Sequence, residues 1–234
     1  MYLLALETAT PVASVAVYRQ DQLLVLHSVH SQRTHSVHLL PMIKSALAAA
    51  SLTMRDLQGL AVSSGPGSFT GLRIGLAAAR TLGQVLNIPL CGVSTLDALA
   101  YRLRFTRGYV CAMLYARKNE VYYALYNCGE GRISRLTPLQ AAAPQRVAEE
   151  LAAYREGVLC VGDGVLAYRE SFSRMENLTV ADGALHLPGA DCIAELGLKM
   201  LREGRYNNAF ELLPEYVRLS EAEARLKAQS SGGI

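Results

Sequence analysis

The chain has 234 residues, of which 51% are hydrophobic and 18% are charged, and its formal net charge at pH 7 is +3. This length predicts one large domain or two small ones, with enough apolar residues for a sizeable core. The weak net charge does not indicate a nucleic-acid-binding protein, which usually carries a concentrated basic stripe. No apolar run reaches the roughly 18–20 residues that cross a bilayer, and the first residues lack the features of a signal peptide. We therefore expect a cytoplasmic protein without a membrane partner.

The first half of the chain predicts a β-meander followed by alternating helices and strands. Apolar or alternating segments at residues 2–6, 12–18 and 23–28 predict three strands, and a helix at 39–50 follows a polar connector. Pro41 fits the first turn of that helix. The later elements of this half are a strand at 57–62, a glycine-rich turn, a helix at 70–86, a strand at 90–93 and a helix at 95–103.

A basic loop at residues 104–108 precedes a second meander with strands at 110–115, 121–126 and 133–136. A helix at 143–154, a strand at 158–161 and a helix at 191–203 follow, with Asp191 as the N-cap of the last helix. The halves share one order of elements, which predicts a duplicated α/β fold with two subdomains, residues 1–106 and 107–234. The five cysteines form no Cys-x-x-Cys pair and are expected to be buried free thiols.

The glycine-rich turn is the most informative segment, because it joins a buried strand to a helix N-terminus. Free backbone N–H groups at such a place suit an anion. As a phosphate or nucleotide loop, the turn would use Gly65, Gly67, Ser68, Thr70, Gly71 and Arg73. As a structural element, it would be a tight turn that positions the following helix. Its spacing is neither that of a P-loop nor that of a dinucleotide-binding fingerprint.

The helices at residues 39–50 and 70–86 carry few charges, namely Lys44 in the first and Arg73 and Arg80 in the second. A helix that is apolar nearly all round is either central to a core or shared with another subunit. In a domain this small, we favour the second interpretation, and ordinary core packing is the alternative. The residues assigned to this partner-binding surface are Leu39, Leu40, Ile43, Leu47, Leu72, Gly75, Leu76, Ala79, Arg80 and Gly83. A second apolar stripe on the longer helix consists of Ile74, Ala78, Leu82 and Val85.

Several segments together resemble the bacterial TsaB family, also called YeaZ. They are Leu-Ala-Leu-Glu-Thr-Ala at 4–9, His-Ser-Val-His-Leu-Leu-Pro at 35–41, Ser-Gly-Pro-Gly-Ser-Phe-Thr-Gly-Leu-Arg-Ile-Gly at 64–75, the hairpin at 116–122 and Pro-Glu-Tyr-Val-Arg at 214–218. The resemblance implies the duplicated actin/Hsp70/sugar-kinase-like fold. It also implies a non-catalytic scaffold that pairs with the paralogous subunit TsaD and works with the ATPase TsaE. The product of that system is N6-threonylcarbamoyladenosine in tRNAs that read codons beginning with A.

By this resemblance the chain has no catalytic residue, metal or cofactor of its own, since TsaD and TsaE use the ATP and the metal. It would bind tRNA only indirectly. From the apolar helices themselves we expect a homodimer through the same surface when TsaD is absent, because uncovered apolar helices bury their surface against another subunit. The His-x-x-x-His metal pair of TsaD is missing, because His27, His30, His35 and His38 are spaced by three, five and three. An aspartate of related kinases is replaced by Glu7.

Two other function classes remain open from the sequence. One is an ATP-dependent enzyme of the same fold that acts on its own. A Gly-Asp-Gly turn at residues 162–164 would face its nucleotide cleft, but Tyr115 stands where the family commonly has an aspartate. The other is an RNA-binding module in which Arg102, Arg104 and Arg107 contact phosphates, although three such arginines are more often a solvated face.

Overall fold

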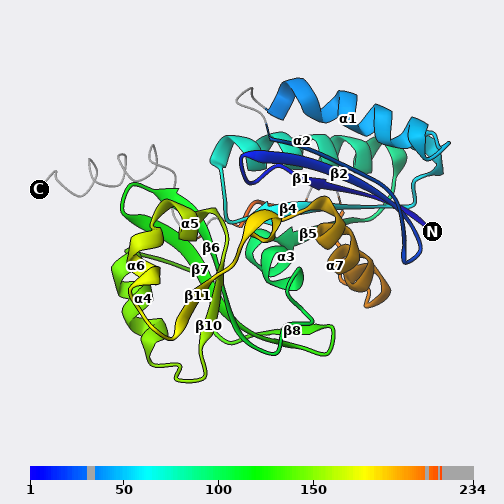
Figure 1. Ribbon diagram of the computed structural model, residues 1–234. Coiled ribbons are helices and arrows are strands. Elements are labelled where there is room, and N and C mark those ends of the chain that lie inside the picture. Colours follow the sequence, from blue (N-terminus) through cyan, green and yellow to red (C-terminus); the bar gives the residue numbers. More distant parts are fainter. Residues whose placement is uncertain (31–34, 209–210, 216, 218–234) are drawn as a thin grey trace, which may run out of the picture.

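The computed structural model describes residues 1–30, 35–208, 211–215 and 217. Two β-sheets with flanking helices make up the molecule (Figure 1). The strands of the first sheet are β1 (Tyr2–Glu7), β2 (Val12–Arg19), β3 (Gln22–His30), β4 (Gly59–Gly65) and β5 (Leu90–Ser94). Those of the second are β6 (Gly108–Arg117), β7 (Glu120–Gly129), β8 (Arg132–Arg135), β9 (Gln140–Ala142), β10 (Val158–Val161) and β11 (Leu178–Val180). The α-helices are α1 (His35–Ala49), α2 (Phe69–Leu86), α3 (Thr95–Tyr101), α4 (Pro144–Ala152), α5 (Asp163–Ala167), α6 (Arg169–Ser173) and α7 (Ala190–Arg202).

The two sheets share one strand order, which confirms the predicted duplication. The first sheet runs β3-β2-β1-β4-β5 and the second runs β8-β7-β6-β10-β11, with β9 paired to β7 outside this path. Each sheet begins as an antiparallel meander. Its first strand then pairs in parallel with a later strand, β1 with β4 and β6 with β10. The helical crossovers that parallel pairing requires are α1 in the first half and α4 in the second.

Helices α1 and α2 cover one face of the first sheet, and both lie on the same side of it in Figure 1. Their buried side chains, Leu39, Ile43 and Leu47 of α1 with Leu72 and Leu76 of α2, belong to one cluster. The sheet contributes the alternate residues that point to this face, which include Leu4, Leu6, Val15, Val17, Leu60 and Val62. The period-2 alternation of the strands thus builds one continuous core beneath the two helices.

The last helix of each half packs on the sheet of the other half. Leu96, Leu99 and Leu103 at and after α3 join the core of the second sheet. Ile193 and Leu198 of α7 join the core on the free face of the first sheet. The strands of the two sheets therefore lie on either side of the boundary between residues 106 and 107, whereas each half contributes a helix to the core of the other sheet. The remaining face of the second sheet is covered by α4 and α6 through Val147, Leu151 and Phe172.

Some local predictions differ from the structure. Helix α1 begins at His35, so Pro41 lies inside the helix and not in its first turn. The N-cap of α7 is Gly189 and not Asp191. The carboxylate of Asp191 instead forms an ion pair with the guanidinium of Arg102, at 3.0 Å. This ion pair connects the start of α7 to the end of α3. The sequence pattern did not predict the strands β9 and β11, because they contain only three residues each.

The expectation of buried free thiols is confirmed, since all five cysteines are free and buried. Among the described residues, no helix combines the length and the apolar character needed to cross a bilayer.

Gly197 offers a test of the packing of α7 on the first sheet. A Cβ atom at Gly197 would lie 2.5 Å from the Cβ of Ala61 in β4, so we expect Gly197→Val to lower the free energy of unfolding by about 1–3 kcal/mol. The control is Lys199→Val on the exposed side of the same helix. Urea denaturation measures both variants, and equal midpoints would contradict the packing described here.

Candidate functional site at the junction of the two sheets

The carboxyl ends of β1, β4 and β5 meet at one edge of the first sheet, where buried polar side chains are concentrated. Strands β1, β4 and β5 run parallel to one another. The buried polar residues at or just beyond their ends are Glu7, Thr8, Thr10, Ser63, Ser64, Ser94 and Thr95. Because open α/β sheets bind ligands beyond the carboxyl ends of their strands, this edge is the first place to look for a site.

The glycine-rich turn closes over this edge and is held by the turn between β1 and β2. Ser68 is the N-cap of α2, and its hydroxyl accepts a hydrogen bond from the Gly71 N–H at 3.2 Å. The Ser68 N–H donates to the carbonyl of Ala9 at 2.7 Å, and the Thr8 hydroxyl donates to the carbonyl of Gly71 at 2.8 Å. Several polar groups that could face a ligand therefore bind this chain's own backbone.

The glycines of the turn stand where the backbone of other segments comes too close for a side chain. A Cβ atom would lie 2.4 Å from the Ala9 carbonyl oxygen at Gly67 and 2.0 Å from the Thr8 carbonyl oxygen at Gly71. At Gly65 it would lie 2.6 Å from the carbonyl oxygen of Glu215. Close intramolecular packing thus accounts for these glycines without a bound phosphate, which supports the structural interpretation of the turn.

Two other residues of the proposed phosphate loop lie at the exposed start of α2. Thr70 is exposed, and Arg73 places its guanidinium 3.9 Å from the ring centroid of Phe69. Arg73 therefore stacks on a neighbouring aromatic side chain, where it has a cation–π partner.

Among the described residues at this edge of the first sheet, Glu7 is the carboxyl group that is fully buried. Its side chain is fully buried, Oε1 accepts a hydrogen bond from the Ala9 N–H at 2.7 Å, and Oε2 has no partner among the described residues. Burial raises the pKa of this carboxyl to about 7, and the negative charge of Asp163 adds to the effect. Glu7 is therefore largely protonated below neutral pH, unlike a carboxylate that holds a divalent cation.

Asp163 faces this edge from the second half of the molecule. It begins α5 directly after β10, and its Oδ1 accepts the backbone N–H of Tyr115 at 2.9 Å. Burial raises the pKa of Asp163, while His186 opposes the shift. The charge of Asp163, the aspartate of the Gly-Asp-Gly turn, thus raises the pKa of Glu7 from the other half of the molecule, an effect that the sequence pattern did not predict.

The remaining predicted site residues lie mainly in the core. Of the residues assigned to partner binding, those that are buried in this chain are Leu39, Ile43, Leu47, Leu72, Gly75, Leu76, Ala79 and Gly83. They are packed beneath α1 and α2 and are not available at the surface in this conformation. Leu40 is 53% exposed and Arg80 is half-buried, so these two residues are the assigned ones that another subunit could reach.

The outer side of the same two helices is exposed, and we refer to it as the α1–α2 surface. Its apolar members include Val37 and Leu40, each 53% exposed, and Val85, which is 76% exposed. Its exposed cations are Lys44 and Arg73, and neither helix contains an acidic residue. This surface therefore suits a partner with an apolar centre and acidic groups at its rim.

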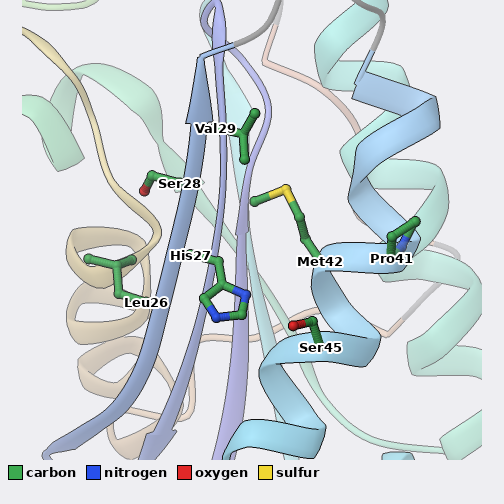
Figure 2. A pocket seen from close by; sticks show the side chains of 7 residues that line it. All are labelled: Leu26, His27, Ser28, Val29, Pro41, Met42 and Ser45. Atoms are coloured by element: carbon green, nitrogen blue, oxygen red, sulfur yellow. The ribbon is translucent and has the colours of Figure 1, made fainter.

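Figure 2 shows a surface groove beside this region, between β3 and α1. Its volume is about 480 Å³, and its lining residues are Leu26, His27, Ser28, Val29, Pro41, Met42 and Ser45. The side chain of Met42 points from α1 toward the strand. Neither Glu7 nor Asp163 lines the groove. Within the described ranges, no group of three His, Cys, Asp or Glu side chains could hold a metal ion.

Comparison with known proteins identifies the family. Residues 26–226 match the family model described as TsaD: tRNA N6-adenosine threonylcarbamoyltransferase. The chain is 32% identical to the tRNA threonylcarbamoyladenosine biosynthesis protein TsaB of Escherichia coli, over 97% of this chain and 98% of that protein. The chain belongs to the TsaB family. The Bacillus subtilis protein of the same name is 30% identical over 96% of this chain and 97% of its own length.

A solved structure supports the same family and the fold. YeaZ from Pseudomonas aeruginosa superposes with a TM-score of 0.79 at 29% identity, covering 92% of this chain and 99% of that one. The resemblance inferred from the glycine-rich turn and its companion segments is thereby confirmed, and the shared strand order of the two sheets confirms the duplicated α/β fold.

Gly71 tests the close packing of the glycine-rich turn. In Gly71→Ala, the new methyl group would collide with the backbone carbonyl of Thr8, and we expect a loss of about 1–3 kcal/mol in the free energy of unfolding. Gly129→Ala is the matched control, because nothing lies within 4 Å of a Cβ atom there. Thermal or urea denaturation measures the difference, and an equally stable Gly71→Ala protein would contradict the packing.

Glu7 makes stability depend on pH in a defined direction. The folded-state pKa of about 7 lies above the ordinary value of 4.5, so the folded chain holds the proton when the unfolded chain has lost it. The contribution of Glu7 to stability therefore falls as pH rises from about 4.5 to about 7, by about 3 kcal/mol in total.

The variant Glu7→Gln stays neutral, so we expect its stability relative to the wild type to rise over that window and to level off above pH 7. Urea unfolding between pH 4.5 and pH 8 gives this difference. Glu149→Gln, which replaces an exposed carboxyl on α4, is the control. A difference between Glu7→Gln and the wild type that is independent of pH would show that Glu7 titrates normally.

Proposed function

We propose that this chain is the non-catalytic scaffold subunit that pairs with TsaD to form N6-threonylcarbamoyladenosine in tRNAs reading codons beginning with A. The observation that carries the proposal is full-length similarity to two proteins named tRNA threonylcarbamoyladenosine biosynthesis protein TsaB. The match covers nearly all of each chain, so it extends over both halves of the duplicated fold and not over one shared motif.

The geometry of the junction supports a role without catalysis. The backbone of Thr8 and Ala9 occupies the approach to the glycine-rich turn, and Glu7 is buried with a raised pKa. Neither feature suits a site that must exchange a nucleotide and its metal ion at each turnover. In this proposal TsaD and TsaE use the ATP and the metal, tRNA reaches this chain only through the complex, and the assembly works in the cytoplasm.

The α1–α2 surface is the proposed contact with TsaD. The buried stripe beneath it, which includes Leu72 and Ala79, holds the two helices on the sheet. The outer residues Leu40 and Val85 then supply apolar area, and Lys44 and Arg73 supply charge at the rim. Substitutions at Gly75 or Ala79 would disrupt the core itself, so they cannot test the interface.

In the absence of TsaD, the same surface would pair with a second copy of this chain. Such a homodimer brings together two surfaces that contain cations and no acidic residue. Like charges repel and salt screens this repulsion, so we expect added salt to raise the affinity of the homodimer. Added salt should lower the affinity for a partner with an acidic rim, because it screens the attraction. Sedimentation at two salt concentrations measures both trends.

A second candidate function is an ATP-dependent enzyme of this fold that acts alone. The approach of Glu7 and Asp163 at the ends of the strands favours it, since acidic groups organise the metal in such enzymes. Calorimetry with ATP and Mg²⁺ on the isolated chain separates the two functions. We expect no turnover, and tight binding with hydrolysis would overturn the scaffold proposal.

The α1–α2 surface is tested by the double variant Leu40→Glu/Val85→Glu. Both side chains are largely exposed, so the fold should be retained, while two carboxylates in the apolar centre should weaken binding to TsaD by at least tenfold. The measurements are co-purification with TsaD and threonylcarbamoylation of tRNA with TsaD, TsaE and the adenylate donor supplied.

The control for the double variant is Leu166→Glu, at a 46% exposed position on α5 in the other half of the molecule. Equal binding by the double variant and this control would place the TsaD contact elsewhere. Full modification of tRNA in the complete absence of this chain would overturn the proposed function itself.

A further inference from the structure

The loop between α3 and β6 presents an aromatic ring to solvent. Phe105 is 71% exposed. Its ring rests against the turn between β7 and β8, where a Cβ atom at Gly131 would lie 3.1 Å from the ring. The Gly131 N–H also donates to the carbonyl of Arg104, at 3.1 Å, so the loop and the turn are fixed to each other. The outer part of this ring is held in place and remains open to solvent.

The arginines near this ring fall into two groups. Arg102 pairs with Asp191 and Arg104 pairs with Glu195, each at 3.0 Å, so two members of the cluster first considered for RNA are committed to α7. The Arg104 guanidinium also lies 4.3 Å from the ring centroid of Tyr101 and 5.0 Å from that of Phe105. Arg104 thus supports the ring of Phe105 instead of reaching for a ligand.

Arg107 and Arg132 form the second group. Both are exposed, and neither takes part in an ion pair with any described residue. Arg107 is two residues beyond Phe105, and Arg132 directly follows the glycine that touches the ring. Two guanidinium groups therefore lie in the segments on either side of one exposed aromatic face.

We infer that Phe105, Arg107 and Arg132 bind an unpaired stretch of RNA, with a base stacked on the phenyl ring and neighbouring phosphates at the two guanidinium groups. Proteins that bind single strands combine aromatic stacking with cationic groups in this way. The inference rests on the proposed function, in which the complex acts on tRNA, and it adds a direct contact to that function.

The position of this site keeps it free when the other subunit binds. In Figure 1, α1 and α2 lie at one end of the molecule and β8, which begins with Arg132, lies toward the opposite end. An RNA contact here and a protein contact at the α1–α2 surface can therefore exist in the same complex. Glu130 is exposed in the adjoining turn and opposes RNA binding by its charge.

The test is fluorescence anisotropy of the full chain with a labelled 12-nucleotide single-stranded RNA, compared with a duplex of the same sequence. We expect the single strand to bind more tightly. Phe105→Ala should weaken its binding about tenfold, Phe105→Tyr should retain it, and Phe105→Leu should resemble Phe105→Ala, because stacking needs a ring and not merely an apolar group.

The charged groups have separate expected outcomes. Arg107→Ala/Arg132→Ala should reduce the slope of log affinity against log salt by about 1.4, the value for two phosphate contacts on a single strand. Glu130→Gln should tighten binding. Arg155→Ala, at an exposed arginine of the turn after α4, is the matched control and should change nothing. Circular dichroism and thermal melting confirm that each variant is folded.

Two results would overturn the inference. One is binding of the single strand that is unaffected by Phe105→Ala and by the double arginine variant. The other is unchanged RNA binding together with loss of TsaD capture by Phe105→Ala and Phe105→Leu, which would identify the ring as a protein contact. These measurements need no modification activity, so a failure here is distinguishable from a failure of the proposed function, which has its own test.

Discussion

The structure depends on the contact between the β1–β2 turn and the glycine-rich turn that begins α2. The carbonyl groups of Thr8 and Ala9 lie where side chains at Gly71 and Gly67 would otherwise be, and the Ser68 N–H and the Thr8 hydroxyl fix the approach. This contact sets the start of α2, and α2 with α1 covers one face of the first sheet. The position of the outward-facing helical surface therefore follows from a few backbone contacts on the opposite side of the same helix.

The same contact changes the chemistry that the fold can perform. A strand-to-helix turn with uncovered N–H groups suits an anion, but here the Ser68 N–H donates to the carbonyl of Ala9 and the Gly71 N–H donates to the Ser68 hydroxyl. Glu7 is shielded from water and largely protonated below neutral pH, so it does not present the exposed negative charge that attracts a divalent cation. The place where an open α/β sheet suits a ligand is therefore filled here by a contact between two turns of the first half.

The sequence predicted the strands and the long helices well because their apolar periods are strong and local. The duplication and the family also followed from pattern. The sequence did not predict which residues of α2 are buried, because this helix has two apolar stripes and its own sequence does not show which of them faces the sheet. Leu72 and Ala79 proved to be inside, and Val85 outside. The ion pair of Arg102 with Asp191, and the effect of the Asp163 charge on the pKa of Glu7, involve residues far apart in sequence, which no short-range pattern contains.

The exchange of α3 and α7 between the sheets has a consequence for how the chain is made. One face of the first sheet, with Leu3, Ala5 and Ala61, is covered by α7, whose last residue is Arg202. During synthesis the strands of this sheet leave the ribosome long before the helix that covers them. The first half must therefore wait with an apolar face open, and that interval is when a nascent chain most needs a chaperone to prevent aggregation.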